Sequence, residues 1–329
     1  MLSVKVEQFV TCFDSYFLPQ GLALYNSLKI HSEHFVLWVV CLDQRTYDVL
    51  DEYSLPGIKL LFIGAIENDQ LVSLKGSRSK AEYIWTLSPF MPKWIFEADP
   101  DIERVTYLDA DMFFFGDPSL IFEEFELSGK DILITEHAFD EEYDQSTLLG
   151  RFCVQFIIYK RGGSEAVRKW WEDRCLEWCF NRWEDGKFGD QKYLDHWPIL
   201  FPEKVHILKR LDYILAPWNS SRYPSSSLIL WHFHGFRLLT HSRILLHSSY
   251  EISHVIDRQI YIPYAEAVAG QINTDTYSPR NCLKYSKFKQ SIIFYLAAIY
   301  KTIINRKVPS MNPRIRTISL VDINKVISS

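Results

Sequence analysis

The sequence predicts an α/β fold with a Rossmann-like, mostly parallel sheet flanked by helices, and two observations support this. Strand-like and helix-like runs alternate along the first 115 residues. The run at 35–42 (FVLWVVCL) is continuously apolar, as in strands buried on both faces, whereas residues 18–30 carry apolar side chains at helical spacing. Strand–helix–strand repetition implies right-handed crossovers and helices on both faces of a parallel sheet.

The expected elements follow in chain order. Strands are predicted at 8–13, 35–42, 58–63, 104–108 and 112–115. Helices are predicted at 18–30, 46–53 and 81–97, the last interrupted near Pro89 and Pro92. Pro56 and Gly57 separate the second helix from the third strand.

Composition and charge exclude several classes of protein. Of 329 residues, 47% are hydrophobic and 23% charged, which excludes a disordered chain, a collagen and a coiled coil. Residues 280–329 hold ten basic residues and one acid, while the preceding part holds 26 basic and 40 acidic residues. An acidic body argues against nucleic acid as a partner. We expect one domain at 1–283 and a basic tail at 284–329.

The tail allows two interpretations. Residues 291–304 form an apolar segment, too short to span a bilayer, between two groups of basic residues. Such a basic, amphipathic helix can lie on an anionic membrane surface, or it can pack on the body of the protein. The sequence leaves both open.

The N-terminus and the cysteines favour a cytoplasmic location. Residues 1–10 show no basic region followed by an apolar stretch and a cleavage site. Six cysteines in 329 residues are too few for a disulfide scaffold. Cys175 and Cys179 would share a helix face, but two ligands do not make a zinc site.

Carboxylates follow three of the expected strands. Asp14 follows the first strand, Asp43 the second, and Asp109 and Asp111 the fourth. Ligands of such sheets bind at the carboxyl ends of the strands, where carboxylates can hold a hard cation. We interpret Asp43 as a helix cap. For Asp14, a turn-forming role and a ligand-binding role stay open.

The most informative segment is 105–115 (VTYLDADMFFF), in which Asp109 and Asp111 interrupt an apolar run. Burying two like charges costs several kcal/mol each, roughly, unless a cation offsets it. A metal held by oxygen ligands typically bridges to a diphosphate and neutralises a phosphate leaving group.

Two further motifs support a diphosphate site. Asp190 and Gln191 stand at a predicted helix start, where capping alone would also explain Asp190. Residues 228–236 (LILWHFHGF) form a strand ending in His-x-His-Gly. His232 is a candidate third metal ligand, and Gly235 lets backbone N–H groups approach phosphate.

Taken together, these motifs resemble the retaining, family-8-type nucleotide-sugar glycosyltransferases, which include glycogenin and bacterial lipopolysaccharide galactosyltransferases. The order LDAD (108–111), DQ (190–191) and HFHG (232–235) carries the resemblance, which covers roughly residues 8–236. Segments 78–85 (RSKAEYIW) and 184–191 (EDGKFGDQ) are similar to a group of uncharacterised bacterial polysaccharide sugar transferases.

The resemblance implies a GT-A fold with a donor half at about 1–135 and an acceptor half at about 136–283. It implies a hexosyltransferase that moves sugar from a nucleotide-diphosphate donor, a UDP-sugar, to a glycan or lipid-linked acceptor with retention. Its place would be polysaccharide or lipopolysaccharide synthesis, in the cytoplasm or peripherally at the inner membrane face.

The resemblance also assigns residues to roles. The metal ligands for Mn²⁺ (or Mg²⁺) are Asp109, Asp111 and His232. The catalytic residues are Asp190 and Gln191. The donor-binding residues are Phe13, Asp14, Arg78, Asp109, Asp111, Gly235 and Arg237.

The chain departs from the family pattern at three places. Phe13 replaces an acid, and residues 153–155 read CVQ where Asn-x-Gly is expected. The phosphate-binding lysine expected after the glycine motif is Leu238, so Arg237, Arg78 or Lys80 is assigned to the phosphates. Lys80 is more simply explained as a surface charge.

Several alternatives remain. An inverting GT-A enzyme would use Glu136 or Asp140 as a base, and a non-catalytic sugar-binding protein could keep the aromatic surface. A nucleotidyltransferase would need a Gly-rich first loop, which residues 11–16 lack. A haloacid-dehalogenase-type phosphatase would commonly have Thr where Phe113 stands.

Overall fold

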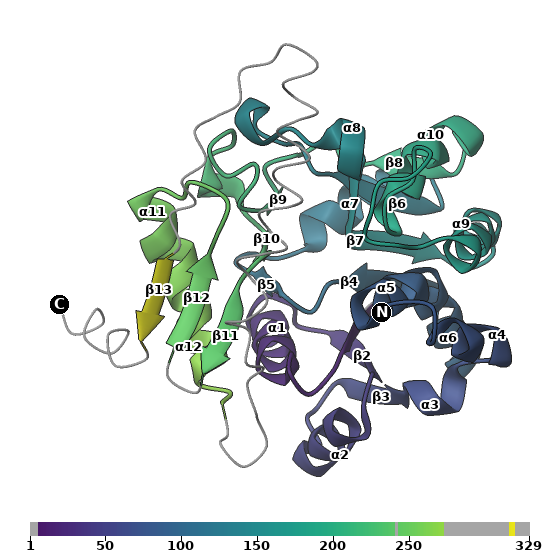
Figure 1. Cartoon of the computed structure of the whole chain (residues 1–329), viewed down its shortest axis with the longest axis horizontal. Coiled ribbons are helices and arrows are strands. Elements are labelled where there is room, and N and C mark those ends of the chain that lie inside the picture. Colours follow the sequence, from purple (N-terminus) through teal and green to yellow (C-terminus); the bar gives the residue numbers. More distant parts are fainter. Residues whose placement is uncertain (1–5, 241–242, 273–315, 320–329) are drawn as a thin grey trace, which may run out of the picture.

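The computed structural model describes residues 6–240, 243–272 and 316–319. Their main feature is a seven-stranded sheet in the order β3–β2–β1–β4–β7–β6–β8 (Figure 1). The strands are β1 (Glu7–Phe13), β2 (Phe35–Cys41), β3 (Ile58–Phe62), β4 (Arg104–Leu108), β6 (Ile132–Glu136), β7 (Phe152–Lys160) and β8 (Val205–Ile207). All neighbouring pairs are parallel except those of β7, which runs antiparallel to β4 and β6.

Helices cover both faces of this sheet, so the predicted α/β class is confirmed. The helices of the first half are α1 (Leu18–His31), α2 (Gln44–Tyr53), α3 (Ile63–Ile66), α4 (Asp69–Leu74), α5 (Lys80–Leu87), a 3₁₀ turn η1 (Ser88–Phe90), α6 (Met91–Ala98) and α7 (Ser119–Ser128). The interruption expected near Pro89 is the turn η1, while α3 and α4 were not predicted.

The second half has shorter elements. Its helical segments are η2 (Glu141–Tyr143), α8 (Ser146–Leu149), α9 (Glu165–Glu177), η3 (Gln191–His196), α10 (Trp197–Leu200), η4 (Ser225–Ser227), α11 (His254–Ile256), η5 (Asp257–Tyr261) and α12 (Ile262–Ala269). Its further strands are β5 (Met112–Phe114), β9 (Ile214–Leu215), β10 (Leu230–His232), β11 (Arg237–Thr240), β12 (Arg243–His247) and β13 (Arg316–Ser319). They form two three-stranded sheets, β5–β10–β9 and β11–β12–β13.

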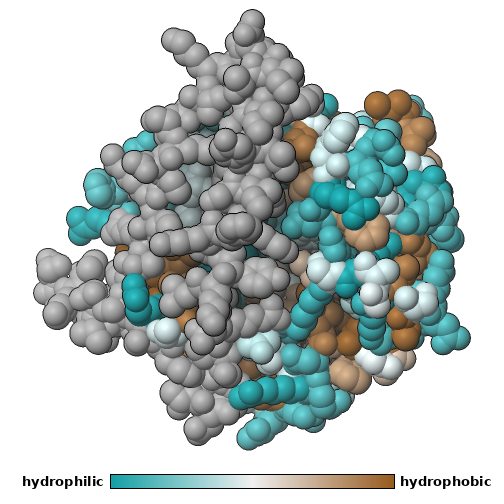
Figure 2. Space-filling model, viewed as in Figure 1, coloured by the Kyte–Doolittle hydropathy of each residue, from teal (hydrophilic) through white to brown (hydrophobic). Residues whose placement is uncertain are grey.

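The period of two in the central strands divides the core into two layers. Phe9 and Val39 pack with residues of α1, α2 and α7, whereas their neighbours Val10 and Val40 pack with residues of α6 and α9. Successive side chains of a strand point to opposite faces, so strands buried on both faces need continuous apolar runs. A third cluster fills the space between β11, β12 and α12. On the described part of the face in Figure 2, apolar side chains form small patches among hydrophilic ones.

Part of the predicted tail is a strand. Arg316–Ser319 forms β13, antiparallel to β12, at the end of the molecule far from α9 (Figure 1). The predicted helix at 291–304 lies outside the described residues. No helix in the described ranges is long and apolar enough to cross a membrane.

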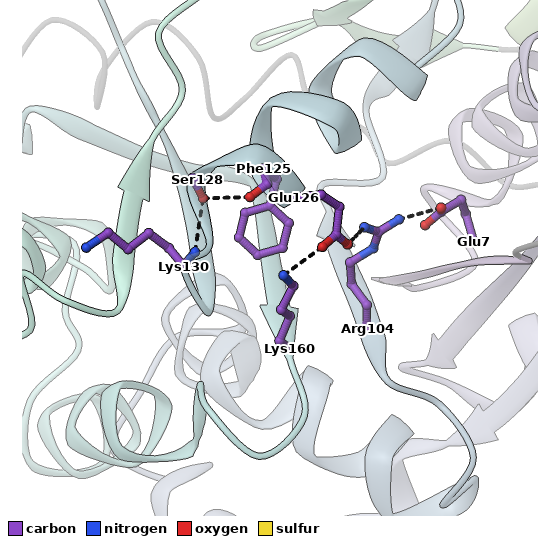
Figure 3. Close-up of polar contacts among 7 residues, drawn as sticks. All are labelled: Glu7, Arg104, Phe125, Glu126, Ser128, Lys130 and Lys160. Atoms are coloured by element: carbon purple, nitrogen blue, oxygen red, sulfur yellow. Dashed lines mark hydrogen bonds and ion pairs between the residues drawn. The ribbon is translucent and has the colours of Figure 1, made fainter.

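A buried arginine connects the amino ends of the parallel strands (Figure 3). Arg104, the first residue of β4, donates to Glu7, the first residue of β1, and to Glu126 of α7. Glu126 also accepts from Lys160 Nζ at 2.8 Å, at the end of β7. The arginine side chain is 4% exposed. This network therefore links the amino ends of β1 and β4, which lie opposite to their carboxyl ends.

We predict that Arg104→Met lowers the free energy of unfolding by about 1–3 kcal/mol, because it leaves Glu7 and Glu126 without their buried cation. This change in free energy is smaller than that expected for a fully buried ion pair, because the Glu126 side chain is 43% exposed. Urea unfolding measures the change. As a control, Lys130→Met removes an exposed pair with Glu203 and should cost less than about 0.5 kcal/mol. Equal stability of the Arg104 variant and the wild type would contradict the prediction.

Candidate active site

A cavity of about 650 Å³ lies at the carboxyl ends of the parallel strands. The strand ends contribute Phe13 and Asp14 after β1, Leu42 after β2, and the turn Asp109–Asp111 after β4. The second half of the chain contributes Asp190, Gln191, His232, Gly235 and Arg237. The structure therefore brings together all the predicted site residues except Arg78.

The Asp-x-Asp element is the turn by which the chain leaves the large sheet. Asp109 N–H donates to the carbonyl of Gln155 at 3.1 Å, so the turn stays attached to β7. Asp111 C=O accepts from the N–H of Phe233 at 2.9 Å, which attaches it to the small sheet. Both carboxylates are thereby held at the junction of two sheets.

His232 is placed beside this turn by strand pairing. β10 runs antiparallel to β5, with His232 opposite Met112. Its Nε2 lies 3.3 Å from Asp111 Oδ1 and 3.9 Å from Asp109 Oδ2. One ligand atom from each of the three residues lies within 4.8 Å of the others.

The electrostatics of this trio fit a divalent cation. Burial, together with Asp111, raises the pKa of Asp109. Burial also opposes the charge on Asp111, but His232 outweighs it and holds the Asp111 pKa below its usual range. Conversely, Asp111 raises the pKa of His232 despite its burial. Two carboxylates and one imidazole are a donor set that Mn²⁺ accepts.

Asp190 does not cap the helix that follows it. As the residue before η3 it makes no side-chain capping bond, and its Oδ2 accepts from Ser88 Oγ at 2.8 Å. Gly189 precedes it with φ +53°, a left-handed conformation that glycine adopts without strain. Burial, with Asp109 nearby, raises the pKa of Asp190 to about 7. The capping explanation is thus wrong, and a buried carboxyl faces the cavity.

Asp14 has the turn-forming role that the sequence left open, and it also lines the cavity. One carboxylate oxygen accepts from the N–H groups of Tyr16 and Phe17 at 3.0 and 3.3 Å, a turn-forming role. The other pairs with Lys80 Nζ at 2.5 Å within the cavity. Asp43, in contrast, caps α2 by accepting from the N–H of Thr46 at 2.9 Å, which confirms its interpretation as a cap.

Of the three candidate phosphate-binding cations, the cavity holds two. Arg237 lines it, and its charge contributes to the low pKa of Asp111. Arg78 lies outside it: its buried guanidinium donates to Thr86 and, at 2.7 Å, to the carbonyl of Leu176. Lys80 is exposed, as expected of a surface charge, and it also lines the cavity, where it pairs with Asp14.

Aromatic side chains form one wall of the cavity. His137 stacks on Phe139 with ring centroids 4.6 Å apart, and the indole N–H of Trp218 donates to the His137 carbonyl at 2.8 Å. Tyr250 completes this wall. Other tryptophans of the second half, Trp171, Trp178 and Trp197, are buried, whereas Trp183 is 55% exposed.

Gln155 was noted only as a departure from a pattern. It lies in the middle of β7 and is 1% exposed, and its side chain contacts His232. The available signal was one amide in an otherwise apolar strand (FCVQFIIY), because a buried polar group needs a partner.

Comparisons with known proteins place the chain among relatives. No family model matches it. It is 34% identical to YfnF of Bacillus subtilis (strain 168) over 246 residues, covering 69% of this chain and 80% of YfnF. It is 30% identical to YfnD of the same organism over 261 residues, covering 73% and 82%. The chain belongs to the YfnF/YfnD family. The names of these family members state no activity.

Solved structures of glycosyltransferases share part of the chain path. GlyE of Streptococcus pneumoniae TIGR4 has a TM-score of 0.49 at 15% identity, covering 84% of this chain and 66% of that one. Galactosyltransferase LgtC has a TM-score of 0.48 at 11% identity, covering 84% and 99%. Mouse xyloside xylosyltransferase 1 has a TM-score of 0.46 at 14% sequence identity, and the match covers 70% of this chain and 98% of that one. These structural similarities are too low to indicate a function. The function of this member of the YfnF/YfnD family therefore has to be argued from the geometry of its own site.

The raised pKa of Asp190 predicts a pH-dependent cost in stability. Because the folded chain keeps this proton up to about pH 7 while the unfolded chain loses it near pH 4, stability falls as pH rises through that window. Asp190→Asn removes the charge, so in EDTA it should exceed wild type at pH 8, by at most about 4 kcal/mol, and match it at pH 4.

Urea unfolding at both pH values tests this. Asp43→Asn is the control of opposite sign, because hydrogen bonds from Thr46 and Ser15 outweigh burial and lower the Asp43 pKa. It should be less stable than wild type at pH 8. No gain for Asp190→Asn at pH 8 would contradict the prediction.

Proposed function

We propose that the protein is a metal-dependent glycosyltransferase of the GT-A type. It moves a hexosyl group from a nucleotide-diphosphate donor, a UDP-sugar, to a glycan or glycolipid acceptor, with retention. The observation that carries the proposal is the trio Asp109, Asp111 and His232 in the same cavity as the buried Asp190.

The trio would hold Mn²⁺ (or Mg²⁺), which when bound offsets the two buried carboxylates and neutralises negative charge on a diphosphate. Arg237 lines the cavity near Asp111, and Gly235 has φ +86°. A left-handed glycine beside a phosphate leaves backbone N–H groups free to approach it. These residues would bind the diphosphate.

The first loop would bind the nucleoside. Phe13 and Asp14 line the cavity at the end of β1, and Asp14 is held by its own turn and by Lys80. Gly21 makes room for this arrangement, since a Cβ there would lie 2.4 Å from the Phe13 ring. The ring and the carboxylate are therefore fixed before any ligand arrives.

Asp190 would face the reacting carbon of the sugar, with Gln191 at the sugar hydroxyls. In transfer, the bond from the anomeric carbon to the diphosphate oxygen breaks, the acceptor oxygen bonds to that carbon, and the acceptor's proton passes to the departing diphosphate oxygen. A carboxylate beside the carbon stabilises the positive charge that develops, or attacks it as a nucleophile. Both roles are compatible with the position of Asp190.

Two observations weaken the alternative of inversion. An inverting enzyme needs a carboxylate base on the acceptor side, and Glu136 is instead paired with Arg151 Nη2 at 2.6 Å. Asp140 accepts from the hydroxyl of Ser221. Both carboxylates lie outside the cavity.

Three sequence-based expectations remain predictions. They are the division into donor and acceptor halves, the contact of 284–329 with an anionic membrane surface, and the cytoplasmic or peripheral location. A test of the tail should replace its lysines rather than delete it, since deletion would also remove β13 from its pairing with β12.

Nucleotide binding tests the site directly. We predict that UDP, but not GDP or CDP, raises the melting temperature in the presence of Mn²⁺. At one hundred times Kd the gain is about 2.7 kcal/mol, or several degrees. Asp111→Asn should abolish the Mn²⁺-dependent part, whereas Asp117→Asn, outside the cavity, should keep it. A full shift in Asp111→Asn, or none with any nucleotide, would reject the metal–diphosphate site.

Product stereochemistry tests the mechanism. With a UDP-sugar and a glycan acceptor that together give product, NMR of the new glycosidic bond should show the anomeric configuration of the donor, because the buried Asp190 carboxylate lines the cavity without belonging to the metal trio. An inverted product would exclude the proposed role of Asp190.

A further inference from the structure

Gln155 touches two of the three proposed metal ligands although it is not itself a ligand. Its side-chain Oε1 lies 2.7 Å from His232 Nδ1, and its backbone carbonyl accepts the N–H of Asp109 at 3.1 Å. We propose that Gln155 is a positioning residue that fixes the orientation and the tautomer of His232 for metal binding. This inference rests on the proposed function.

The side-chain contact determines which ring nitrogen is available. Because an amide oxygen only accepts, a hydrogen bond from His232 Nδ1 to Gln155 Oε1 favours the form of the ring in which Nδ1 carries the hydrogen. In the neutral ring, Nε2 then keeps its lone pair, and Nε2 is the atom that faces Asp109 and Asp111 at 3.9 and 3.3 Å. The opposite tautomer would present an N–H to the metal position. Gln155 therefore selects the tautomer that can ligate.

The backbone contact links the same residue to the Asp-x-Asp turn. Because β7 is antiparallel to β4, the carbonyl of Gln155 reaches the N–H just past the end of β4. A displacement of β7 at this point would shift Asp109 and His232 together. Gln155 thus contacts two ligands, Asp109 and His232, that are 123 positions apart along the chain.

The surroundings of Gln155 argue against a purely structural glutamine. Its neighbours in β7 are apolar, and it is 1% exposed, so an amide there is costly unless it is hydrogen-bonded, as it is to His232. An apolar residue would fill a sheet interior without that requirement. Partners that orient a ligating histidine typically change metal affinity by about 10- to 100-fold when they are removed.

The experiment titrates Mn²⁺ alone into the full-length chain and follows free Mn²⁺ by electron paramagnetic resonance. Gln155→Met keeps the length of the side chain and loses the acceptor, so the Kd should rise by about tenfold or more. Gln155→Glu keeps an acceptor oxygen and should bind Mn²⁺ within about threefold of wild type. Thermal melting in EDTA confirms that each variant is folded.

Gln8→Met is the matched control. Gln8 Oε1 accepts the indole N–H of Trp38 at 2.9 Å, a bond of the same type in the same sheet. This variant should bind Mn²⁺ as wild type does. Wild-type affinity in Gln155→Met, an equal loss in Gln8→Met, or failure of Gln155→Glu to restore binding would each overturn the inference.

Asp111→Asn separates this inference from the proposed function. If the wild type binds Mn²⁺ and Asp111→Asn does not, the metal site stands, and the Gln155 variants decide the positioning role alone. If the wild type binds no Mn²⁺, both the metal site and the role of Gln155 are rejected.

Discussion

The arrangement of the site depends on one constraint: two carboxylates are held close together where a large sheet gives way to a small one. Asp109 is attached to β7 and Asp111 to the segment after β10, so neither can move away from the other without breaking backbone hydrogen bonds. Their repulsion must be offset from outside the turn. His232 and Arg237 do so in part, and a divalent cation would do so fully. The stability of the surrounding hydrophobic core offsets the energetic cost of holding the two carboxylates close together.

The same constraint explains why the site carries unfavourable energy. Asp190 is buried with a raised pKa beside Asp109, and one hydroxyl hydrogen bond from Ser88 only partly compensates for it. Unfavourable groups of this kind persist where the rest of the fold is stable enough to hold them, and they concentrate at functional sites. Continuous apolar strands and the Arg104 network provide that stability at a distance from the site.

Much of this could be predicted from sequence, because the strongest signals were local. Apolar runs gave the positions of β1, β2 and β4, and carboxylates interrupting an apolar run gave Asp109 and Asp111. The reversed direction of β7 could not be predicted, since its run of apolar residues is the same in either direction. Arg78 was misplaced because its guanidinium is buried against Thr86 and the carbonyl of Leu176, contacts between distant segments that the sequence does not reveal. The strand β13 was hidden because its pairing with β12 joins distant segments.

The antiparallel direction of β7 determines which part of the cavity wall can change in sequence at little cost. Because β7 runs against its neighbours, the connection from β6 to β7 starts and finishes at adjacent strand ends, where Glu136 pairs with Phe152. Between them, residues 137–151 form an excursion that supplies His137, Phe139, Gln145 and Leu149 to the cavity wall. Insertions in its exposed part, such as Glu141 and Glu142, cost little, since the anchor points are fixed by the sheet. Sequence changes there can therefore reshape this wall without displacing Asp109 and Asp111, which are held by hydrogen bonds to Gln155 and Phe233.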